Sequence, residues 1–200
     1  MTTFLCTISG LTPLLQHRFS DADEVQSSTR AVHIRTKDPR VEAEAVAYRT
    51  KEGYLYMPGA AIARLLREAG AAHKQRGSRK SMKYVVPAAT LVLEDQIILR
   101  DGHGKPLKDF EVDSRPVVIP ATKGRIMRHR PRLNNWHAEF SVEVDVETMD
   151  ATLVHQLLVE GGTKLGVCDY RPETSGPFGK YQVVSWAELA QRPPLAEAAD

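Results

Sequence analysis

The sequence predicts an α+β domain with a ferredoxin-like (RRM-like) βαββαβ antiparallel sheet, two helices on one face and basic insertions. Three observations favour this fold: two amphipathic helices each lie between strand-like segments, one strand alternates strictly, and turn residues separate the elements. Both helices of such a fold cover one face of the sheet. The other face is left to meet a ligand, as in RNA-recognition modules.

The first predicted elements are strands. Residues 4–11 are apolar and β-branched, and Thr12-Pro13 ends that strand. Residues 41–48 alternate weakly. A turn at 51–53 precedes an apolar and aromatic strand at 54–57.

Pro58-Gly59 opens the first helix, because proline suits a first helical turn, where its missing amide would have no partner. Gly70 is a plausible end. The apolar face at helical spacing consists of Ile62, Leu65, Leu66 and Ala69.

The middle of the chain predicts a strand-like stretch at 84–99, a turn at 101–106 and a short strand at 117–119. Residues 138–146 form the clearest strand, because Phe140, Val142, Val144 and Val146 alternate with polar residues.

Asp150 is expected to cap the second helix, whose apolar face is Leu153, Val154, Leu157 and Leu158. Gly161-Gly162 is predicted to end it. Residues 181–184 predict the last strand. Together the elements indicate one domain over residues 1–188, with insertions at about 20–40, 71–83 and 114–135 and a loose tail at 189–200.

Composition is that of a globular protein, with 42% apolar and 26% charged residues. No apolar run approaches the ~18 residues of a membrane span, and the N-terminus does not resemble a signal peptide. We therefore expect a cytoplasmic protein without a membrane partner, in which Cys6 and Cys168 are reduced core thiols.

Charge is segregated along the chain. Residues 69–93 and 114–138 contain 11 of the 27 basic residues and none of the 25 acidic ones. Surfaces usually intersperse both signs, so this segregation indicates a polyanionic partner. The alternative is two solvated loops whose charge is incidental.

The densest basic run is residues 125–132, where arginines suit bidentate phosphate contacts. Trp136 and Tyr84 are candidates for stacking on a base, although core positions are commoner for such residues. The predicted nucleic-acid contacts are Lys74, Arg76, Arg79, Lys80, Lys83, Lys123, Arg125, Arg128, Arg130, Arg132, Lys164, Arg171 and Lys180.

Residues 161–180 are rich in glycine. Their backbone amides either cradle phosphates or simply make turns, and the sequence leaves both open. The stretch lacks the Gly-Lys-Ser/Thr ending of a phosphate-binding P-loop.

We predict no cofactor, metal site or catalytic residue. None of the seven histidines stands at zinc-ligand spacing. His155 is expected to be structural, and His17 is the one histidine worth testing as a general base.

Two motifs occur in the order found in the repeat-associated mysterious proteins (RAMPs), the RRM-like subunits of CRISPR effector complexes. Residues 57–67 resemble the opening of that family's first helix, and residues 161–180 are similar to its glycine-rich loop. The start at Thr12–His17 and the end at Gly166–Gly179 also resemble uncharacterised phage and prophage proteins. Residues 63–64 are Ala-Arg where RAMPs often have Lys-Gly, and the loop lacks a dense Gly-x-Gly-x-x-Gly run.

The resemblance implies a non-catalytic subunit that oligomerises along single-stranded RNA, or within a CRISPR-type or phage ribonucleoprotein. Single-stranded DNA stays open. Two alternatives remain: a metal-independent endoribonuclease with His17 as base, and a phage-encoded interaction protein, such as a defence inhibitor, that binds an acidic protein surface. The polyanion hypothesis requires the two basic segments to converge on a common groove.

Overall fold

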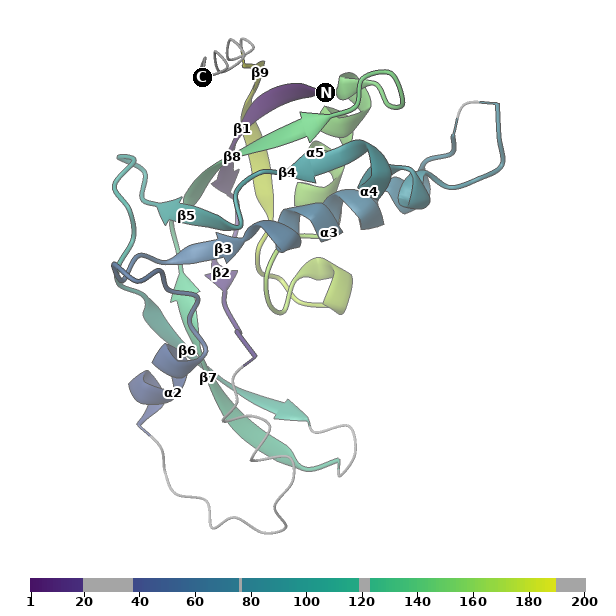
Figure 1. Cartoon of the computed structure of the whole chain (residues 1–200). Coiled ribbons are helices and arrows are strands. Elements are labelled where there is room, and N and C mark those ends of the chain that lie inside the picture. The colour runs from purple at the N-terminus through teal and green to yellow at the C-terminus, as the bar shows by residue number, and fades with distance from the viewer. Residues whose placement is uncertain (20–37, 76, 119–122, 190–200) are drawn as a thin grey trace, which may run out of the picture.

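Two antiparallel sheets organise the chain (Figure 1). The computed structural model describes residues 1–19, 38–75, 77–118 and 123–189. One sheet has six strands and the other has three. With the helices packed against them, these sheets confirm the α+β class.

The six-stranded sheet is centred on the first strand, which pairs antiparallel with both the eighth and the ninth. The strand order is β3-β5-β8-β1-β9, with β4 also paired to β8. Read as β9, β1, β8 and β5, this order is consistent with a ferredoxin-like arrangement. The strands are β1 (Thr2–Gly10), β3 (Tyr56–Pro58), β4 (Thr90–Val92), β5 (Gln96–Arg100), β8 (His137–Val144) and β9 (Tyr181–Glu188).

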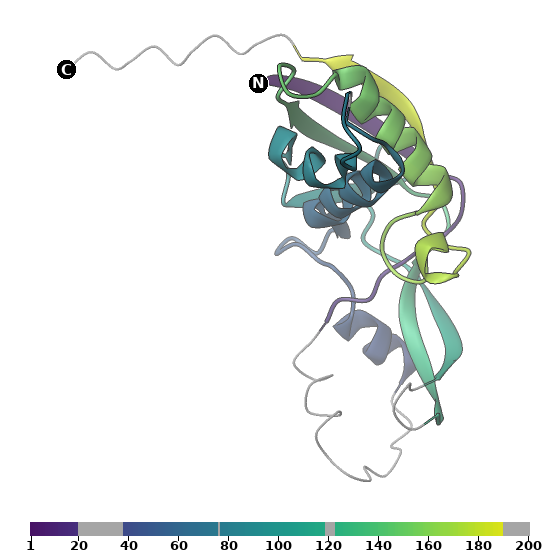
Figure 2. The same ribbon diagram turned by 90° about the vertical axis from the view of Figure 1, so that its right-hand side faces the viewer.

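Two helices, α3 (Gly59–Ala69) and α5 (Ala151–Lys164), pack against one another on one face of this sheet. Figure 2 shows both in front of β1 and β8. The strands turn every second side chain towards them, so Phe4, Cys6 and Ile8 of β1 are buried.

The second helix does not end at Gly161-Gly162 as predicted, but continues to Lys164. Both glycines lie at close contacts. A Cβ on Gly161 would collide with the Leu65 side chain of α3, and one on Gly162 would lie 2.6 Å from the backbone oxygen of Tyr181 in β9. The glycines therefore permit helix packing and do not stop the helix. Asp150 caps the helix as predicted, because its side chain accepts a hydrogen bond from the Thr152 amide at 2.8 Å.

The weak alternation at residues 41–48 does not correspond to a strand. Helix α2 (Pro39–Ala45) occupies most of this stretch. Asp38 accepts a hydrogen bond from the Arg40 amide at 2.8 Å, and Pro39 stands in the first turn. These two start signals outweigh the weak alternation.

The stretch at 84–99 is likewise not a single strand. It contains the end of a 3₁₀ turn η2 (Met82–Tyr84), the short helix α4 (Val86–Ala89), and then β4 and β5. Pro87 in the first turn of α4 explains the break, because proline cannot donate to a sheet ladder. Two further 3₁₀ turns are η1 (Gly70–Ala72) and η3 (Pro172–Thr174).

The three-stranded sheet has the order β2-β7-β6 and consists of β2 (Leu14–Leu15), β6 (Glu111–Val118) and β7 (Arg125–Leu133). Strands β6 and β7 form a long hairpin that extends away from the six-stranded sheet in both views (Figures 1 and 2). Most of the predicted insertion at 114–135 thus belongs to the two paired strands, 111–118 and 125–133. Its polar, proline-containing strand β7 shows none of the apolar alternation by which strands are recognised. Most of the predicted insertion at 20–40 and the predicted tail, except Leu189, lie outside the described residues.

Candidate nucleic-acid interface

Four arginines share one face of the hairpin. Residues directly opposite one another in an antiparallel pair point to the same side, and that side recurs every second residue. Arg128 pairs with Arg115, Arg130 with Asp113, and Arg132 with Glu111. The arginine face consists of Arg115, Arg128, Arg130 and Arg132.

The arginine face is directed at the loop that follows α5. The Arg130 Nε lies 3.1 Å from the Asp169 Oδ2, and the Arg115 guanidinium lies 4.5 Å from the centre of the Phe178 ring. Arg115 also donates to Asp113 at 2.7 Å. Arg130 and Arg115 are therefore each paired with a carboxylate of the protein.

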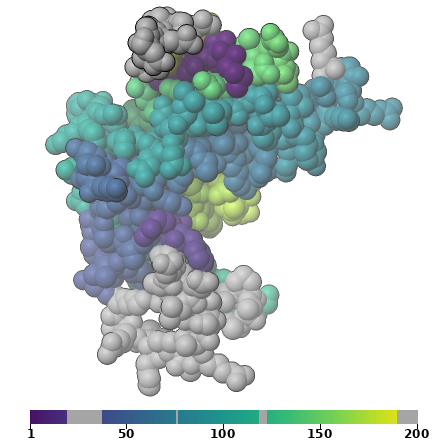
Figure 3. Space-filling view, viewed as in Figure 1, coloured from purple at the N-terminus to yellow at the C-terminus, as the bar shows by residue number. Residues whose placement is uncertain are grey.

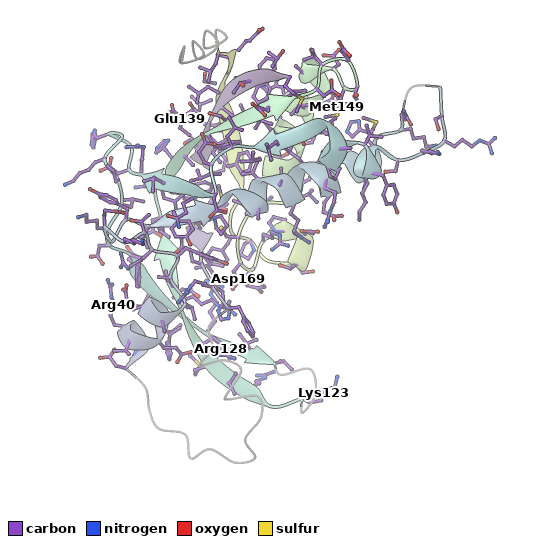
Figure 4. The ribbon with its side chains drawn as sticks, in the orientation of Figure 1. Arg40, Lys123, Arg128, Glu139, Met149 and Asp169 are labelled. Carbon is purple, nitrogen blue, oxygen red and sulfur yellow. The ribbon has the colours of Figure 1, made fainter. Side chains whose placement is uncertain are left out.

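The far end of the hairpin carries two exposed cations, Lys123 and Arg125. Figure 4 shows Asp169 near the root of the hairpin, with Arg128 and then Lys123 progressively farther along it. Arg128, Arg130 and Arg132 thus form a line of cations along β7, whereas Arg125 pairs with Val118 and lies on the opposite face of the hairpin.

The first basic segment lies elsewhere. Lys74, Arg79 and Lys80 are exposed on a loop that projects from the body beyond α3, at a different end of the molecule from the hairpin (Figures 1 and 3). Lys83, nearer the body, pairs with Glu68 at 2.8 Å. Arg76 lies outside the described residues. The expectation that the two basic segments converge on one groove is therefore wrong, because α3 and the sheet lie between them.

A pocket of about 350 Å³ opens where the three resemblance motifs of the sequence meet. His17 follows β2, Tyr48 precedes β3, Pro58 ends β3, and three residues come from α3. The rest belong to the glycine-rich segment. This loop pocket is lined by His17, Tyr48, Pro58, Ala60, Ala61, Arg64, Gly166, Val167, Cys168, Asp169 and Arg171.

The glycine-rich segment uses much of its backbone for its own turns. The amides of Val167, Asp169 and Gly179 donate to the carbonyls of Gly179, Leu15 and Pro13. Gly179 has φ +70°, and a Cβ there would collide with the Val167 carbonyl. These contacts favour the turn interpretation of the glycines over a phosphate cradle.

Two predicted contacts of this segment lie outside the loop pocket. Lys164 stands in the last turn of α5 and pairs with Glu160 at 3.0 Å. Lys180 is half-buried where its backbone meets Thr12, whose hydroxyl accepts from the Lys180 amide at 3.0 Å. Arg171 alone among the three reaches the pocket.

Arg171 shares a carboxylate with Arg64. Arg64 donates to both oxygens of Glu173, at 2.7 and 2.9 Å, and the Arg171 Nε donates to one of them at 2.9 Å. The hydrogen bonds from Arg64, followed by those from Arg171, hold the pKa of Glu173 below its usual range. This bridge ties α3 to the glycine-rich loop.

Loss of the Glu173 carboxylate is expected to lower the stability of the protein in a pH-dependent way. Because the pKa of Glu173 is lowered on folding, its stabilisation is complete above the ordinary value of 4.5 and is lost as the pH falls through the lowered folded value. We expect Glu173→Gln to lower the free energy of unfolding by about 1 kcal/mol near neutral pH, since the pairs are partly exposed. The difference from the unmodified protein should disappear near pH 2 in urea titrations. An equal difference at both pH values would show that shape, and not charge, explains the loss.

Sequence reasoning did not identify Gln16, Tyr48, Arg64 or Asp169 as site residues. Gln16 is fully buried, its Nε2 donates to the Tyr56 carbonyl at 2.9 Å, and its Oε1 accepts from the Tyr48 amide at 3.0 Å. It therefore fixes Tyr48 beside the segment that carries His17. The sequence signal for this role was a glutamine directly after the two apolar residues Leu14 and Leu15.

The open face of the six-stranded sheet does not suit a polyanion. Glu139 and Glu143 of β8 point away from the helices, and the Thr7 hydroxyl on the same face donates to Glu139 at 3.5 Å. The other residues of β1 on this face, Thr3, Leu5 and Ser9, carry neither a positive charge nor an aromatic ring. Arg100 of β5 pairs with His137 and lies on the same side as these glutamates, so the face that meets RNA in RRM-type modules carries both signs of charge here and no run of cations.

Burial and contacts decide whether Trp136, His155 and Tyr84 are structural residues. Trp136 is 1% exposed, and its indole nitrogen donates to the Thr12 carbonyl at 2.9 Å, so it is a core residue. His155 stacks on Trp186 with ring centres 6.0 Å apart and is structural as expected. Tyr84, in contrast, is 80% exposed and is not a core residue.

The two cysteines are unpaired thiols. Burial raises the pKa of Cys6 to about 12 and that of Cys168 to about 12, so neither is a ready nucleophile. In the described ranges, no three His, Cys, Asp or Glu side chains gather closely enough to hold a metal ion. None of the helices in those ranges has the length and apolar content that a membrane span requires.

No family model matches the chain, and no curated protein does. Among solved structures, the chain is similar to the crystal structure of Cmr6 from Pyrococcus furiosus, with a TM-score of 0.43 and 11% sequence identity. The match covers 90% of this chain and 97% of that chain.

Proposed function

We propose that this chain is a non-catalytic, single-stranded RNA-binding subunit of RAMP type that grips the phosphate backbone along the arginine face of the β6–β7 hairpin. The observation that carries the proposal is that Arg115, Arg128, Arg130 and Arg132 lie on one face of a single hairpin, with the exposed Lys123 and Arg125 at its far end.

The proposed path of the strand follows the distribution of charge. It passes along the arginine face, reaches the loop pocket at Asp169 and avoids Glu139 and Glu143 on the open face of the sheet. Arginine is suited to this role because its guanidinium makes paired hydrogen bonds to phosphate oxygens and stacks on bases. Self-association, or assembly into a larger ribonucleoprotein, belongs to the same proposal.

A second candidate function rests on the position of His17. The loop pocket holds this imidazole together with Arg64 and Arg171, and a base beside cations is the arrangement that metal-independent ribonucleases use. We nevertheless favour binding without cleavage, because Glu173 bridges both arginines and reduces the charge they offer to a transition state.

One titration tests both candidates. A fluorescent RNA strand is titrated with the protein in EDTA at several salt concentrations, and the RNA is then recovered and sized on a denaturing gel. We expect tight binding at low salt, a log–log salt slope of about −0.7 per phosphate contacted, and intact RNA. A matching DNA strand reports any preference for ribose. Absence of binding at low salt would leave an acidic protein as the remaining partner, and cleavage that requires His17 would establish the ribonuclease instead.

A further inference from the structure

We infer that the loop pocket accepts one nucleobase, drawn out of the bound strand, and not a phosphate. This inference rests on the proposed binding of a single strand and assigns the pocket's part in it. The volume of about 350 Å³ lies at the small end of ligand pockets, which span roughly 300–1,000 Å³, and suits a single base with its sugar.

Charge argues against a phosphate in the pocket. Its two guanidinium groups, on Arg64 and Arg171, already share the Glu173 carboxylate, and Asp169 adds a second negative group to the wall. Several backbone amides of the adjoining loop donate within the protein, so they offer no anion cradle. A phosphate would meet nearly balanced charge here, whereas it meets an excess of positive charge along the arginine face.

The polar groups that remain suit the edge of a base. The Asp169 Oδ2 is buried 3.1 Å from the Arg130 Nε, but the side chain as a whole is 32% exposed and lines the pocket, so its other oxygen is the one that we expect a base to reach. Carboxylates accept from the amino groups of bases. The Arg171 NH1 donates to the Cys168 carbonyl at 2.7 Å and so steadies the segment that carries Asp169.

The walls supply the surface on which a base lies. Tyr48 contributes an aromatic ring, held edge-on to Tyr56 with ring centres 5.5 Å apart, and Ala60 and Ala61 leave room opposite the loop. Stacking of a base on an aromatic ring is sequence-tolerant and is worth about 1–3 kcal/mol.

Backbone strain is concentrated in the same wall. Cys168 and Tyr170 adopt left-handed conformations with φ +62° and +46°, although neither is a glycine. Such conformations persist only where the surroundings enforce them, and they gather at binding sites. They flank Asp169, and they set the direction in which its carboxylate points.

The test blocks the pocket without touching the hairpin. Ala60 is exposed and lines the pocket, and Ala63 lies on the same helix outside it, so Ala60→Trp is the blocking variant and Ala63→Trp its matched control. Each is titrated with a short uridine or adenosine strand and with an abasic ribose-phosphate strand of equal length. We expect the unmodified protein and Ala63→Trp to prefer the strand with bases about ten-fold, and Ala60→Trp to lose that preference while it still binds the abasic strand.

A strand containing 4-thiouridine provides a second readout that does not depend on a variant. Irradiation should crosslink it to Tyr48 or to residues 166–171, as mapped by mass spectrometry, and free nucleoside monophosphates should compete poorly. Crosslinks confined to the hairpin, or a full base preference in Ala60→Trp, would overturn the inference. Failure of both strands to bind at low salt would instead refute the proposed function.

Discussion

Removal of three cations from the outer hairpin is expected to weaken RNA binding about a hundred-fold at 0.1 M monovalent salt. The variant is Lys123→Ala/Arg125→Ala/Arg128→Ala, which leaves the partly buried Arg130 and its contact with Asp169 in place. Each lost phosphate contact removes about 0.7 from the log–log salt slope of a single strand. The slope of the triple variant should therefore be about two units shallower, as fluorescence anisotropy at several salt concentrations will show.

The projecting loop provides the matched control. Lys74→Ala/Arg79→Ala/Lys80→Ala removes the same charge from exposed positions at a different end of the molecule. If the hairpin is the interface, this control loses only the weaker, long-range attraction, which salt screens. Equal losses in both variants would mean that binding reports net charge and not a defined surface. Thermal unfolding of both variants separates lost contacts from lost structure.

Substitution of Gly162 by alanine is expected to destabilise the protein, although alanine is the better helix former by about 1 kcal/mol. The added Cβ would lie 2.6 Å from the Tyr181 carbonyl oxygen and 2.7 Å from its ring, inside the contact between α5 and β9. Overpacking of this kind costs about 1–3 kcal/mol. For a chain of this size we expect the melting temperature to fall by roughly 2–12 °C, measured by calorimetry.

Gly102→Ala is the comparison for that experiment. Gly102 lies in a surface turn, and the nearest atom to an added Cβ is the His137 Nε2 at 3.8 Å. Its melting temperature should change little. A rise in the melting temperature of Gly162→Ala would show that helix α5 moves away from β9 at little cost and would revise the packing described here.

The elements that the sequence predicted well are those with a strong local signal. The alternation of Phe140, Val142 and Val144 predicted β8, and the apolar spacing of Ile62 and Leu65 predicted α3. Strand β7 was missed because the residues that stabilise it lie on other segments. Leu15 of β2 pairs with Arg132 of β7, and α2 packs against β7. The sequence of residues 125–133 does not indicate either partner.

The candidate site divides in the same way. Arginines in a run are visible in the sequence, so Arg128 and Arg130 were predicted. Which face they share follows only from the pairing of β6 with β7. Arg64 looked like an ordinary solvent-facing residue of α3, and only the meeting of α3 with Glu173 brings it to the pocket. The two glycines of α5 were misinterpreted because the sequence does not distinguish a glycine that ends a helix from one that permits a close contact within it.

Glu139 and Glu143, which face away from the helices, give the molecule an electrical polarity. Under the proposed function, cations along the hairpin and these carboxylates on the sheet would turn the protein towards a nucleic acid during diffusion. Encounters that begin with the wrong side would be repelled before contact, so we expect these acids to act mainly on the association rate and hardly at all on how long the complex lasts.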